Sequence, residues 1–241
     1  AWLGRLWFAP NSLLEYTRKG RAMIGIYAPY WTFDARTASR YTGQRGEHYF
    51  ETRTVTVRVN GRSEQRQEQV QKTRWYPASG RVARRFDDVL VVASTSLPSN
   101  LSYGLEPWDL KALQPFSPDY LAGFQAEGYT VGLKDGYATG QQIMGRVIQA
   151  DVRRDIGGDV QQITSLETAY SEETFKHILL PIWMAAYKYA GKSYRFQVNG
   201  QTGEVQGERP YSIWKIGFAV LAAMIVVAAV IYLNESGAFN N

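Results

Sequence analysis

The stretch AYKYAGKS, residues 186–193, has the side chains and spacing that come nearest to a known chemistry. It fits a loose nucleotide-binding pattern, in which a small residue and four arbitrary residues precede Gly-Lys-Ser. A phosphate loop leads from a strand into a helix, and its glycines let backbone N–H groups surround the phosphates. Here Tyr187 and Tyr189 alternate as on a strand, and the alternating run YRFQVN follows at 194–199. We therefore predict a β-hairpin with its tip at residues 190–192, not a phosphate loop.

The acidic residue that a nucleotide site also needs is misplaced. In phosphate-loop proteins an Asp on a second strand holds the magnesium ion, and it ends that strand, whereas Asp87 and Asp88 precede the apolar run at 89–92. The Gly-x-Ser-x-Gly pattern of a nucleophile elbow does not occur. We predict no catalytic residues and no cofactor-binding residues.

Metal ligands are scarce in this sequence. It contains no cysteine, and its two histidines, His48 and His177, have no nearby partner at ligand spacing. The stretch DIGGD at 155–159 sets two carboxylates around a glycine pair, but two acids alone seldom bind Mg²⁺ or Ca²⁺. A helix end with Gly157 at positive φ is the favoured interpretation. We predict no metal site within this sequence.

Two further groups invite a functional interpretation. The aromatic residues Tyr30, Trp31 and Phe33 stand beside Asp34, where core packing is expected and an aromatic binding face is the alternative. Basic residues gather in the first third of the chain, where residues 1–90 hold 16 Lys and Arg against 8 Asp and Glu, a net of +8.

Within that basic third, Arg81, Arg84 and Arg85 precede Asp87 and Asp88. We expect these five residues to form a surface charge cluster. Contact of the arginines with anionic lipid is the alternative.

The chain from Ile216 to Leu233 consists of 18 uncharged, mostly apolar residues. That length suffices to cross the hydrocarbon core of a bilayer. Trp214 precedes the segment and Tyr232 lies near its end, where interfacial aromatic residues are expected, and Lys215 flanks it. We predict a single transmembrane helix with these residues as its anchor.

Charge on the two sides of this segment predicts its orientation. Arg209 and Lys215 lie on the N-terminal side, whereas residues 234–241 carry only Glu235. Because Lys and Arg favour the cytoplasmic side, we predict a single-pass membrane protein with a cytoplasmic N-terminal domain.

Alternation and turn residues predict mostly strands elsewhere. Apolar and aromatic residues fill 22–33, and residues 52–59 alternate before a typical hairpin turn at Asn60-Gly61. A return strand is expected over 67–82 with a second turn at 77–80. The stretch 87–95 suits a short strand or the start of a helix.

Helices are predicted at three other places. Helix caps and stops mark residues 11–20, and Pro107 suits the first turn of a helix at 105–113. Helical spacing of apolar residues runs over 133–156, up to the glycine pair 157–158, and strands return after 160. The fold class is therefore α+β, mostly antiparallel sheet with a few helices, plus one C-terminal transmembrane helix.

The expected organisation has four parts. Residues 1–105 form a basic, β-rich half of the cytoplasmic domain, and residues 106–211 form an α+β half. The transmembrane helix covers 212–234 and a short tail covers 235–241.

Several stretches together resemble a known family. They include IYAPYWTFDA, RRFDDVLVVASTSLP, PWDLKALQPFSPDYLAGFQAEGY, DVRRDIGGD and TFKHILLPIWMAAYKY. In this order they resemble bacterial proteins described as zinc-ribbon-containing or primosomal-protein-N′ (helicase)-like, over nearly the whole chain. The stretch YRFQVNGQTGEVQG also resembles a PepSY-type hairpin. Family members usually carry one or two Cys-x-x-Cys zinc ribbons upstream of the region that corresponds to WLGRLWFAPNSL, residues 2–13. The resemblance thus allows zinc only in a segment preceding residue 1.

The resemblance implies a membrane-anchored cytoplasmic protein, and some relatives recruit phage-shock-protein-A-like or flotillin-like (SPFH) partners. We therefore predict a non-enzymatic adaptor, or an accessory subunit that docks on an integral-membrane complex. A membrane-tethered nucleic-acid-binding protein, as the helicase-like description suggests, is the alternative. An enzyme is the third class, and no residue constellation supports it.

Overall fold

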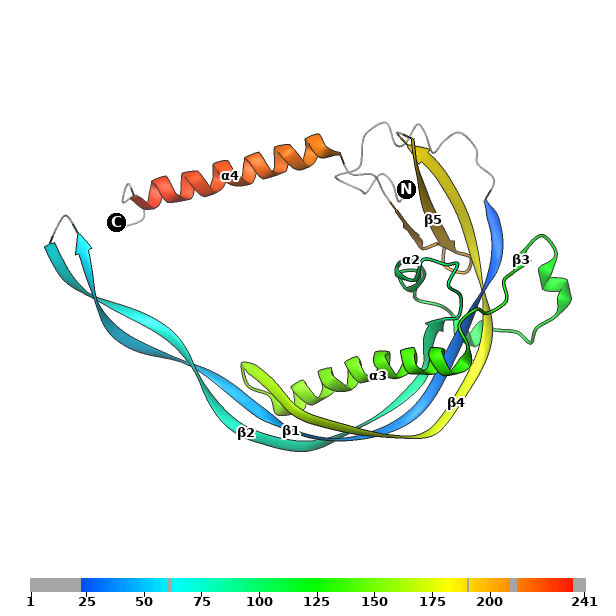
Figure 1. Cartoon of the computed structure of the whole chain (residues 1–241), viewed down its shortest axis with the longest axis horizontal. Helices are drawn as coiled ribbons and strands as arrows, with labels where there is room; N and C mark the ends of the chain where they lie inside the picture. Colours follow the sequence, from blue (N-terminus) through cyan, green and yellow to red (C-terminus); the bar gives the residue numbers. More distant parts are fainter. Residues whose placement is uncertain (1–22, 60–61, 190, 209–211, 236–241) are drawn as a thin grey trace. The chain divides into compact units, whose positions relative to one another are not determined.

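The computed structural model describes residues 23–59, 62–189, 191–208 and 212–235. The strands are β1 (Ile24–Val59), β2 (Arg62–Val92), β3 (Gln125–Ala126), β4 (Val160–Tyr189), β5 (Lys192–Asn199) and β6 (Val205–Gly207) (Figure 1). The helices are α2 (Ser99–Tyr103), α3 (Leu133–Ile156) and α4 (Ile213–Glu235), with 3₁₀ helices η2 (Leu110–Ala112) and η3 (Pro118–Leu121). The predicted class, mostly antiparallel sheet with few helices and a C-terminal helix long and apolar enough to cross a membrane, is confirmed. The helix predicted at 11–20 lies outside the described residues.

The strands are ordered β2-β1-β4-β5-β6, and the short β3 pairs with β1 in parallel. β1 and β2 form one long antiparallel hairpin whose register pairs Val59 with Arg62. Two residues therefore join these strands, as the Asn60-Gly61 pattern predicts, although both lie outside the described residues. β4 and β5 form a second hairpin, which pairs Tyr189 with Lys192.

The chain divides into two compact units. Unit 1 comprises Ala1–Pro29, Ser94–Gly128 and Leu179–Asn241, and unit 2 comprises Tyr30–Ala93 and Tyr129–Ile178. The expected boundary at residue 105 falls inside unit 1. The boundary between the units cuts across the long strands β1 and β4, so each strand contributes one end to each unit. The units therefore do not correspond to the two halves of the sequence.

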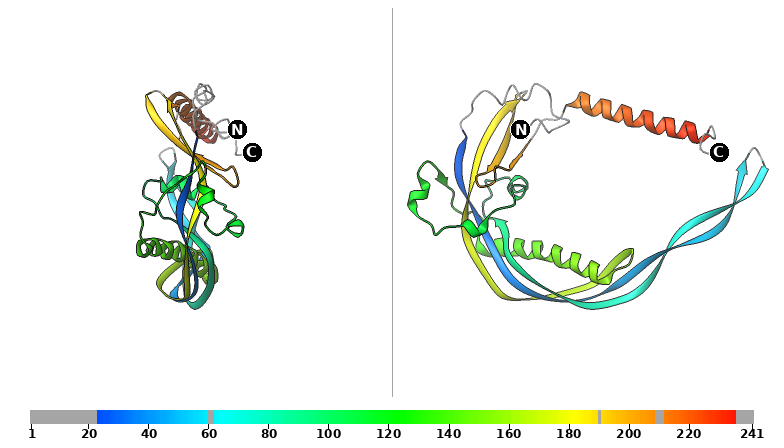
Figure 2. Two further views of the ribbon diagram at one scale, coloured as in Figure 1. Left: turned by 90° about the vertical axis from the view of Figure 1, so that its right-hand side faces the viewer. Right: turned by 180° about the vertical axis from the view of Figure 1, so that it is seen from behind.

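In unit 2, α3 packs along one face of the strands (Figure 2). Every fourth residue of the helix is buried, namely Gly136, Gly140, Met144, Ile148, Val152 and Ile156. Residues four apart share one face of a helix, so this stripe is the contact surface. On the strands it meets the buried aromatic residues Trp31, Phe33, Tyr41 and Phe86.

The first two residues of the stripe permit the close approach of helix and strand. A Cβ atom on Gly136 would lie 2.7 Å from Cδ1 of Trp31, and one on Gly140 would lie 2.9 Å from Cδ2 of Phe33. Any larger residue would push the helix away from the aromatic rings.

Unit 1 has its own buried residues, among them Leu97, Leu101, Leu105, Leu180 and Ile182. The side-chain amide of Asn199 donates hydrogen bonds to the carbonyl oxygens of Leu105, at 2.9 Å, and Pro107, at 3.3 Å. A buried side chain of β5 thus holds the segment that follows α2.

Two expectations about local structure are wrong. No turn interrupts β2 at residues 77–80, because the strand continues through them and pairs Pro77 with Gln44. β2 stands at the end of the strand order, where proline is tolerated because its missing N–H group needs no partner. No helix starts at Pro107, since its carbonyl and that of Leu105 bind Asn199, and only the three residues of η2 are helical there.

Candidate functional site

Arg81, Arg84 and Arg85 do not form one cluster, because neighbouring residues of a strand point to opposite faces. Arg84 points to the helix-covered face of unit 2, where its Nε and Nη2 donate to Asp151 of α3 at 2.5 and 2.8 Å. Arg81 and Arg85 therefore belong to the opposite face, called the open face below. The hydrogen bond with Asp151 raises the pKa of Arg84, and the same bond lowers the pKa of Asp151.

A shallow cleft of about 640 Å³ lies between β2 and the C-terminal half of α3. Its charged lining residues are Arg84, Arg85, Asp151, Arg154 and Asp155. Each carboxylate has a partner within unit 2, because Arg154 lies 3.2 Å from Asp151 and the hydroxyl of Tyr41 donates to Asp155 at 2.6 Å. Burial and this bond raise the pKa of Tyr41 to about 12. These contacts fasten α3 to the strands.

On the open face, arginines oppose one another across β1 and β2. The register pairs Arg36 with Arg85 and Arg40 with Arg81. Between these pairs, Ala38 lies opposite Ala83. Arg36 forms an ion pair with Glu172 at 2.9 Å. Within the described parts of the chain, Arg40, Arg81 and Arg85 have no ion-pair partner, so anionic contact at this face stays a prediction.

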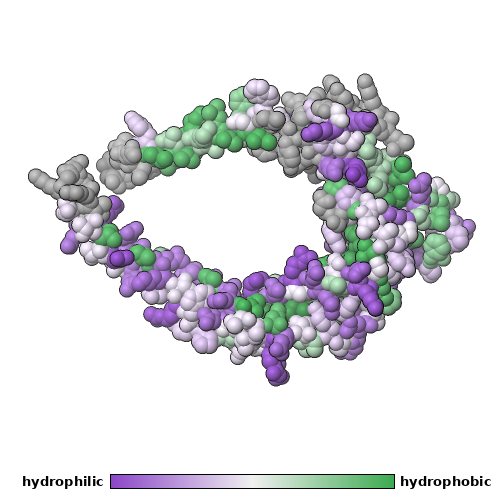
Figure 3. Space-filling view, in the orientation of Figure 1, coloured by the Kyte–Doolittle hydropathy of each residue, from purple (hydrophilic) through white to green (hydrophobic). Residues whose placement is uncertain are grey.

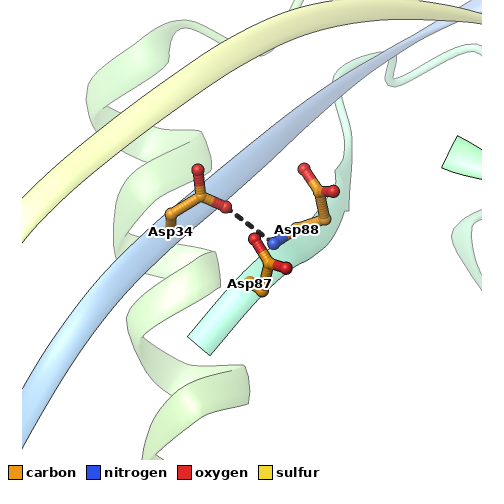
Figure 4. A group of neighbouring side chains, drawn as sticks. All are labelled: Asp34, Asp87 and Asp88. Atoms are coloured by element: carbon orange, nitrogen blue, oxygen red, sulfur yellow. Dashed lines mark hydrogen bonds between the residues drawn. The ribbon is translucent and has the colours of Figure 1, made fainter. Parts of the chain in front are cut away.

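Asp34, Asp87 and Asp88 come together at a β-bulge (Figure 4). The register places Asp87 and Asp88 of β2 opposite the single residue Asp34 of β1. Asp88 has a φ of 52°, which is unusual for a residue other than glycine. The bulge removes the N–H group of Asp88 from the ladder, and a carboxylate oxygen of Asp34 accepts it at 2.7 Å.

The three carboxylates have ligand atoms within 4.8 Å of one another, a spacing that a metal ion could use. An ammonium group already stands there, because Nζ of Lys176 lies 2.7 Å from Asp88 and 3.7 Å from Asp34. Burial opposes ionisation of Asp34, but bonds from Asp88 N–H and Thr174 and the charge of Lys176 outweigh it and lower its pKa. The arrangement serves to close the bulge, and the absence of a metal stays a prediction.

The aromatic residues beside Asp34 are buried, as the core interpretation predicted. Tyr30, Trp31 and Phe33 are each at most 5% exposed. Nε1 of Trp31 donates to the carbonyl of Val131 at 2.9 Å, and its ring lies 4.9 Å from that of His177. Burial lowers the pKa of His177.

The acids of the DIGGD stretch serve different contacts. Asp155 binds Tyr41, whereas Asp159 accepts the backbone N–H of His48 at 2.7 Å. Gly157 has a φ of 68° and ends α3, as predicted.

The Gly-Lys-Ser stretch forms the predicted hairpin. Tyr187 is 1% exposed, stacks on Tyr194 across the strands at 5.4 Å, and donates to the carbonyl of Glu208 at 3.0 Å. Gly191 takes a φ of 80° next to the start of β5. Because Lys192 begins a strand and not a helix, the phosphate-loop geometry is missing.

The C-terminal helix α4 (Ile213–Glu235) extends the apolar run 216–233 at both ends and lies within one residue of the predicted bounds 212–234. Trp214–Tyr232 forms a 19-residue span with a mean hydropathy of 2.4, and none of it is buried. Trp214 and Tyr232 are 80% and 71% exposed. Hydrophobic colour follows α4 along its length in Figure 3. By length and composition, α4 is suited to cross a membrane once.

The chain is similar to a protein of Bacillus subtilis. It is 24% identical over 201 residues to the uncharacterized protein YdjG of Bacillus subtilis (strain 168), a match covering 81% of this chain and 54% of that protein. The chain thus spans about half the length of this relative, whose name assigns no activity. Neither a family model nor a solved structure matches the chain.

Two features escaped prediction from the sequence. The bulge joins Asp34 to Asp88, 54 positions away, and only the strand register brings them together. The opposed arginines depend on the same register. One sequence pattern could have indicated the opposed arginines. Basic residues recur four positions apart in both strands, at 36 and 40 and at 81 and 85.

Proposed function

We propose that this chain is a non-enzymatic adaptor or accessory subunit that holds a protein partner at the cytoplasmic face of the bacterial inner membrane. The observation that carries the proposal is the exposed, apolar span Trp214–Tyr232. A soluble protein buries such a helix in its core. Lipid is the environment that its length and composition fit.

The polar clusters of unit 2 support a non-enzymatic role. Asp151 is bound by two arginines, and the bulge carboxylates share Lys176. A catalytic side chain must be accessible to substrate. These side chains instead form ion pairs that join one helix or strand to another. The cytoplasmic orientation rests on the charge of Arg209 and Lys215.

The expected partner is a phage-shock-protein-A-like or SPFH protein, or a larger integral-membrane complex. Because the chain has no cysteine, a photoactivatable group can be attached at one introduced cysteine. Ala83→Cys places this group on the open face, and Ala150→Cys places it at an exposed position of α3. Crosslinking is done in native membranes, followed by purification in mild detergent and mass spectrometry.

If the chain is an adaptor, one of the two sites is expected to crosslink reproducibly to one defined protein. The other site is the matched control. Removing residues 216–241 releases the chain from the membrane and abolishes recovery of a membrane complex. Recovery of the chain alone from both sites would contradict the proposal.

A second candidate function is binding of nucleic acid, favoured by the opposed pairs Arg36–Arg85 and Arg40–Arg81. Binding through phosphates weakens steeply with salt. The double variant Arg81→Glu/Arg85→Glu is expected to abolish retention of DNA or RNA at low salt, whereas Arg84→Gln is not. Absence of retention by the unaltered chain at low salt removes this candidate.

Lys192→Ala tests the remaining enzymatic interpretation. Because Lys192 pairs with Tyr189 at the start of a strand, the variant is expected to leave ATP binding and turnover at the level of the unaltered chain. ATP turnover that is abolished by this change alone would restore the phosphate-loop interpretation.

A further inference from the structure

The open face of unit 2 carries an excess of positive charge. The register sets Arg36 opposite Arg85 and Arg40 opposite Arg81, and like charges directly opposite each other destabilise a pair of strands. Arg36 has an ion-pair partner in Glu172, at 2.9 Å. No ion pair joins the other three arginines to any residue that the structure describes. An anion from outside the chain would relieve this repulsion.

The same two strands treat their basic residues differently on the opposite face. There Arg84 is paired with Asp151 of α3. Further along the hairpin, Arg45 lies 3.1 Å from Glu47 on that face. Acidic residues therefore accompany basic ones on the opposite face.

On the open face, β1 and β2 contribute no acidic residue over a long stretch. Alternate residues of a strand share a face, so this stretch comprises the even-numbered residues 36–50 of β1 and the odd-numbered residues 71–85 of β2. It starts at the pair Arg36–Arg85 and ends at the pair Phe50–Gln71, and none of its members is Asp or Glu. This set is called the basic–aromatic face.

Two aromatic side chains stand on the same face beyond the arginines. Trp75 lies opposite Gly46, and a Cβ atom on that glycine would lie 2.9 Å from Cζ3 of Trp75. The absence of a side chain at Gly46 thus lets the indole ring lie close over β1. Trp75 is 42% exposed and Phe50 is 66% exposed. The face therefore combines unpaired guanidinium groups with exposed aromatic rings.

We propose that the basic–aromatic face binds the anionic headgroups of a lipid bilayer. Guanidinium groups form bidentate hydrogen bonds with phosphate oxygens, and juxtamembrane basic residues are attracted to the anionic cytoplasmic leaflet. Tryptophan is enriched at the level of the lipid headgroups. Phosphates of anionic lipids would neutralise the opposed arginines, while the two aromatic rings contact the interface.

A bilayer is favoured over another polyanion because the chain itself carries a candidate span. Trp214–Tyr232 is long and apolar enough to cross a membrane, and tethering raises the effective concentration of a second binding surface. The inference rests on this part of the proposed function. It adds that unit 2 also contacts lipid, through residues that Arg84 does not join.

The test uses the full chain in nanodiscs of phosphatidylcholine, either alone or with about one third phosphatidylglycerol. A spin label at Ala83→Cys reports on the basic–aromatic face, and one at Ala150→Cys on an exposed position of α3 is the matched control. With phosphatidylglycerol, the accessibility of the Ala83→Cys label to a water-soluble relaxation agent is expected to fall about twofold or more. The fall should disappear at about 1 M salt, which screens surface charge.

The outcomes separate this inference from the proposed membrane span. A chain that does not co-elute with either nanodisc would contradict the span of α4. A chain that co-elutes with both, but whose Ala83→Cys label has equal accessibility in the two lipids, overturns only the lipid contact. An equal fall at Ala150→Cys overturns it as well.

Charge variants test which residues carry the contact. Arg40→Glu/Arg81→Glu is expected to abolish the effect of phosphatidylglycerol at the Ala83→Cys label. Arg66→Glu/Arg146→Glu makes the same change in charge at exposed positions outside the face and is expected to retain the effect. Equal behaviour of the two double variants overturns the proposal. So does protection of the label by a single-stranded oligonucleotide without any effect of phosphatidylglycerol, which would assign the face to nucleic acid.

Discussion

Asp34 is the residue on which the bulge in β2 depends. Its carboxylate accepts the N–H of Asp88 and the hydroxyl of Thr174, at 2.7 and 2.8 Å. An N–H group left without an acceptor in a partly buried position destabilises the fold. We therefore expect the hydrogen bonds of Asp34 to stabilise the folded state.

We expect Asp34→Ala to lower the free energy of unfolding by about 1–3 kcal/mol, because the N–H of Asp88 and the hydroxyl of Thr174 lose their acceptor. Urea denaturation followed by tryptophan fluorescence measures the change. Asp87→Ala is the control, since Asp87 is exposed and surface changes usually alter stability by about 0.5 kcal/mol or less. Equal losses in both variants would contradict the role of Asp34.

His177 gives a pH dependence at the same scale. Its side chain stays partly exposed, but the neighbouring rings of Trp31 and Tyr129 remove part of its hydration. This desolvation lowers the pKa of His177, so the neutral ring is favoured in the folded state. Its contribution to stability is present above the unfolded pKa of about 6.5 and is lost as pH falls through the lower folded pKa. We expect His177→Phe to reduce the fall in melting temperature between pH 7 and pH 5, and an unchanged fall would exclude His177 as its source.

At the scale of elements, the packing of α3 on the strands depends on glycines, although glycine disfavours helix formation. Gly140 lets the ring of Phe33 approach, whereas Gly145 has no atom within 4 Å of a Cβ position. We expect Gly140→Ala to destabilise the fold by about 1–3 kcal/mol through overpacking. Gly145→Ala is the matched control and is expected to stabilise it by about 0.5–1 kcal/mol. Thermal denaturation of both variants checks the opposite signs.

The sequence was sufficient for elements whose signals are local. The spacing of apolar residues and the glycine pair predicted α3 at Leu133–Ile156 with the bounds that the structure has. Alternation and turn residues also predicted the ends of both hairpins, but they did not predict that residues 34–51 continue the strand and make β1 a single element. Turn signals misled at residues 77–80, because an edge strand accepts a proline that an inner strand would reject.

The parts of the candidate site that depend on register could not be predicted. Nothing local in the sequence states that Arg40 opposes Arg81 or that Asp34 meets Asp88. Those pairings follow from long strands with one bulge, and a shift of one residue would turn each side chain to the other face.

At the scale of the whole molecule, α4 is the element that fits a membrane. A charged residue at the centre of a spanning helix costs about 2.5–3.5 kcal/mol in insertion experiments. Ala223 lies at the middle of the span Trp214–Tyr232, so Ala223→Arg is expected to reduce the fraction of the chain that resists alkaline extraction from membranes. Ala223→Leu is the control, and equal extraction of both variants would contradict a spanning role for α4.

The direction of that crossing is the last prediction. Arg209 precedes the span and Lys215 is its second residue, whereas residues 234–241 contain Glu235 and neither Lys nor Arg. Positive charge is retained on the cytoplasmic side, so Ala83→Cys should be protected in intact spheroplasts from a maleimide that cannot cross membranes. Ser236→Cys should react with it, and both should react after permeabilisation. Labelling of Ala83→Cys alone in intact spheroplasts would reverse the orientation and move the partner of the adaptor to the other side of the membrane.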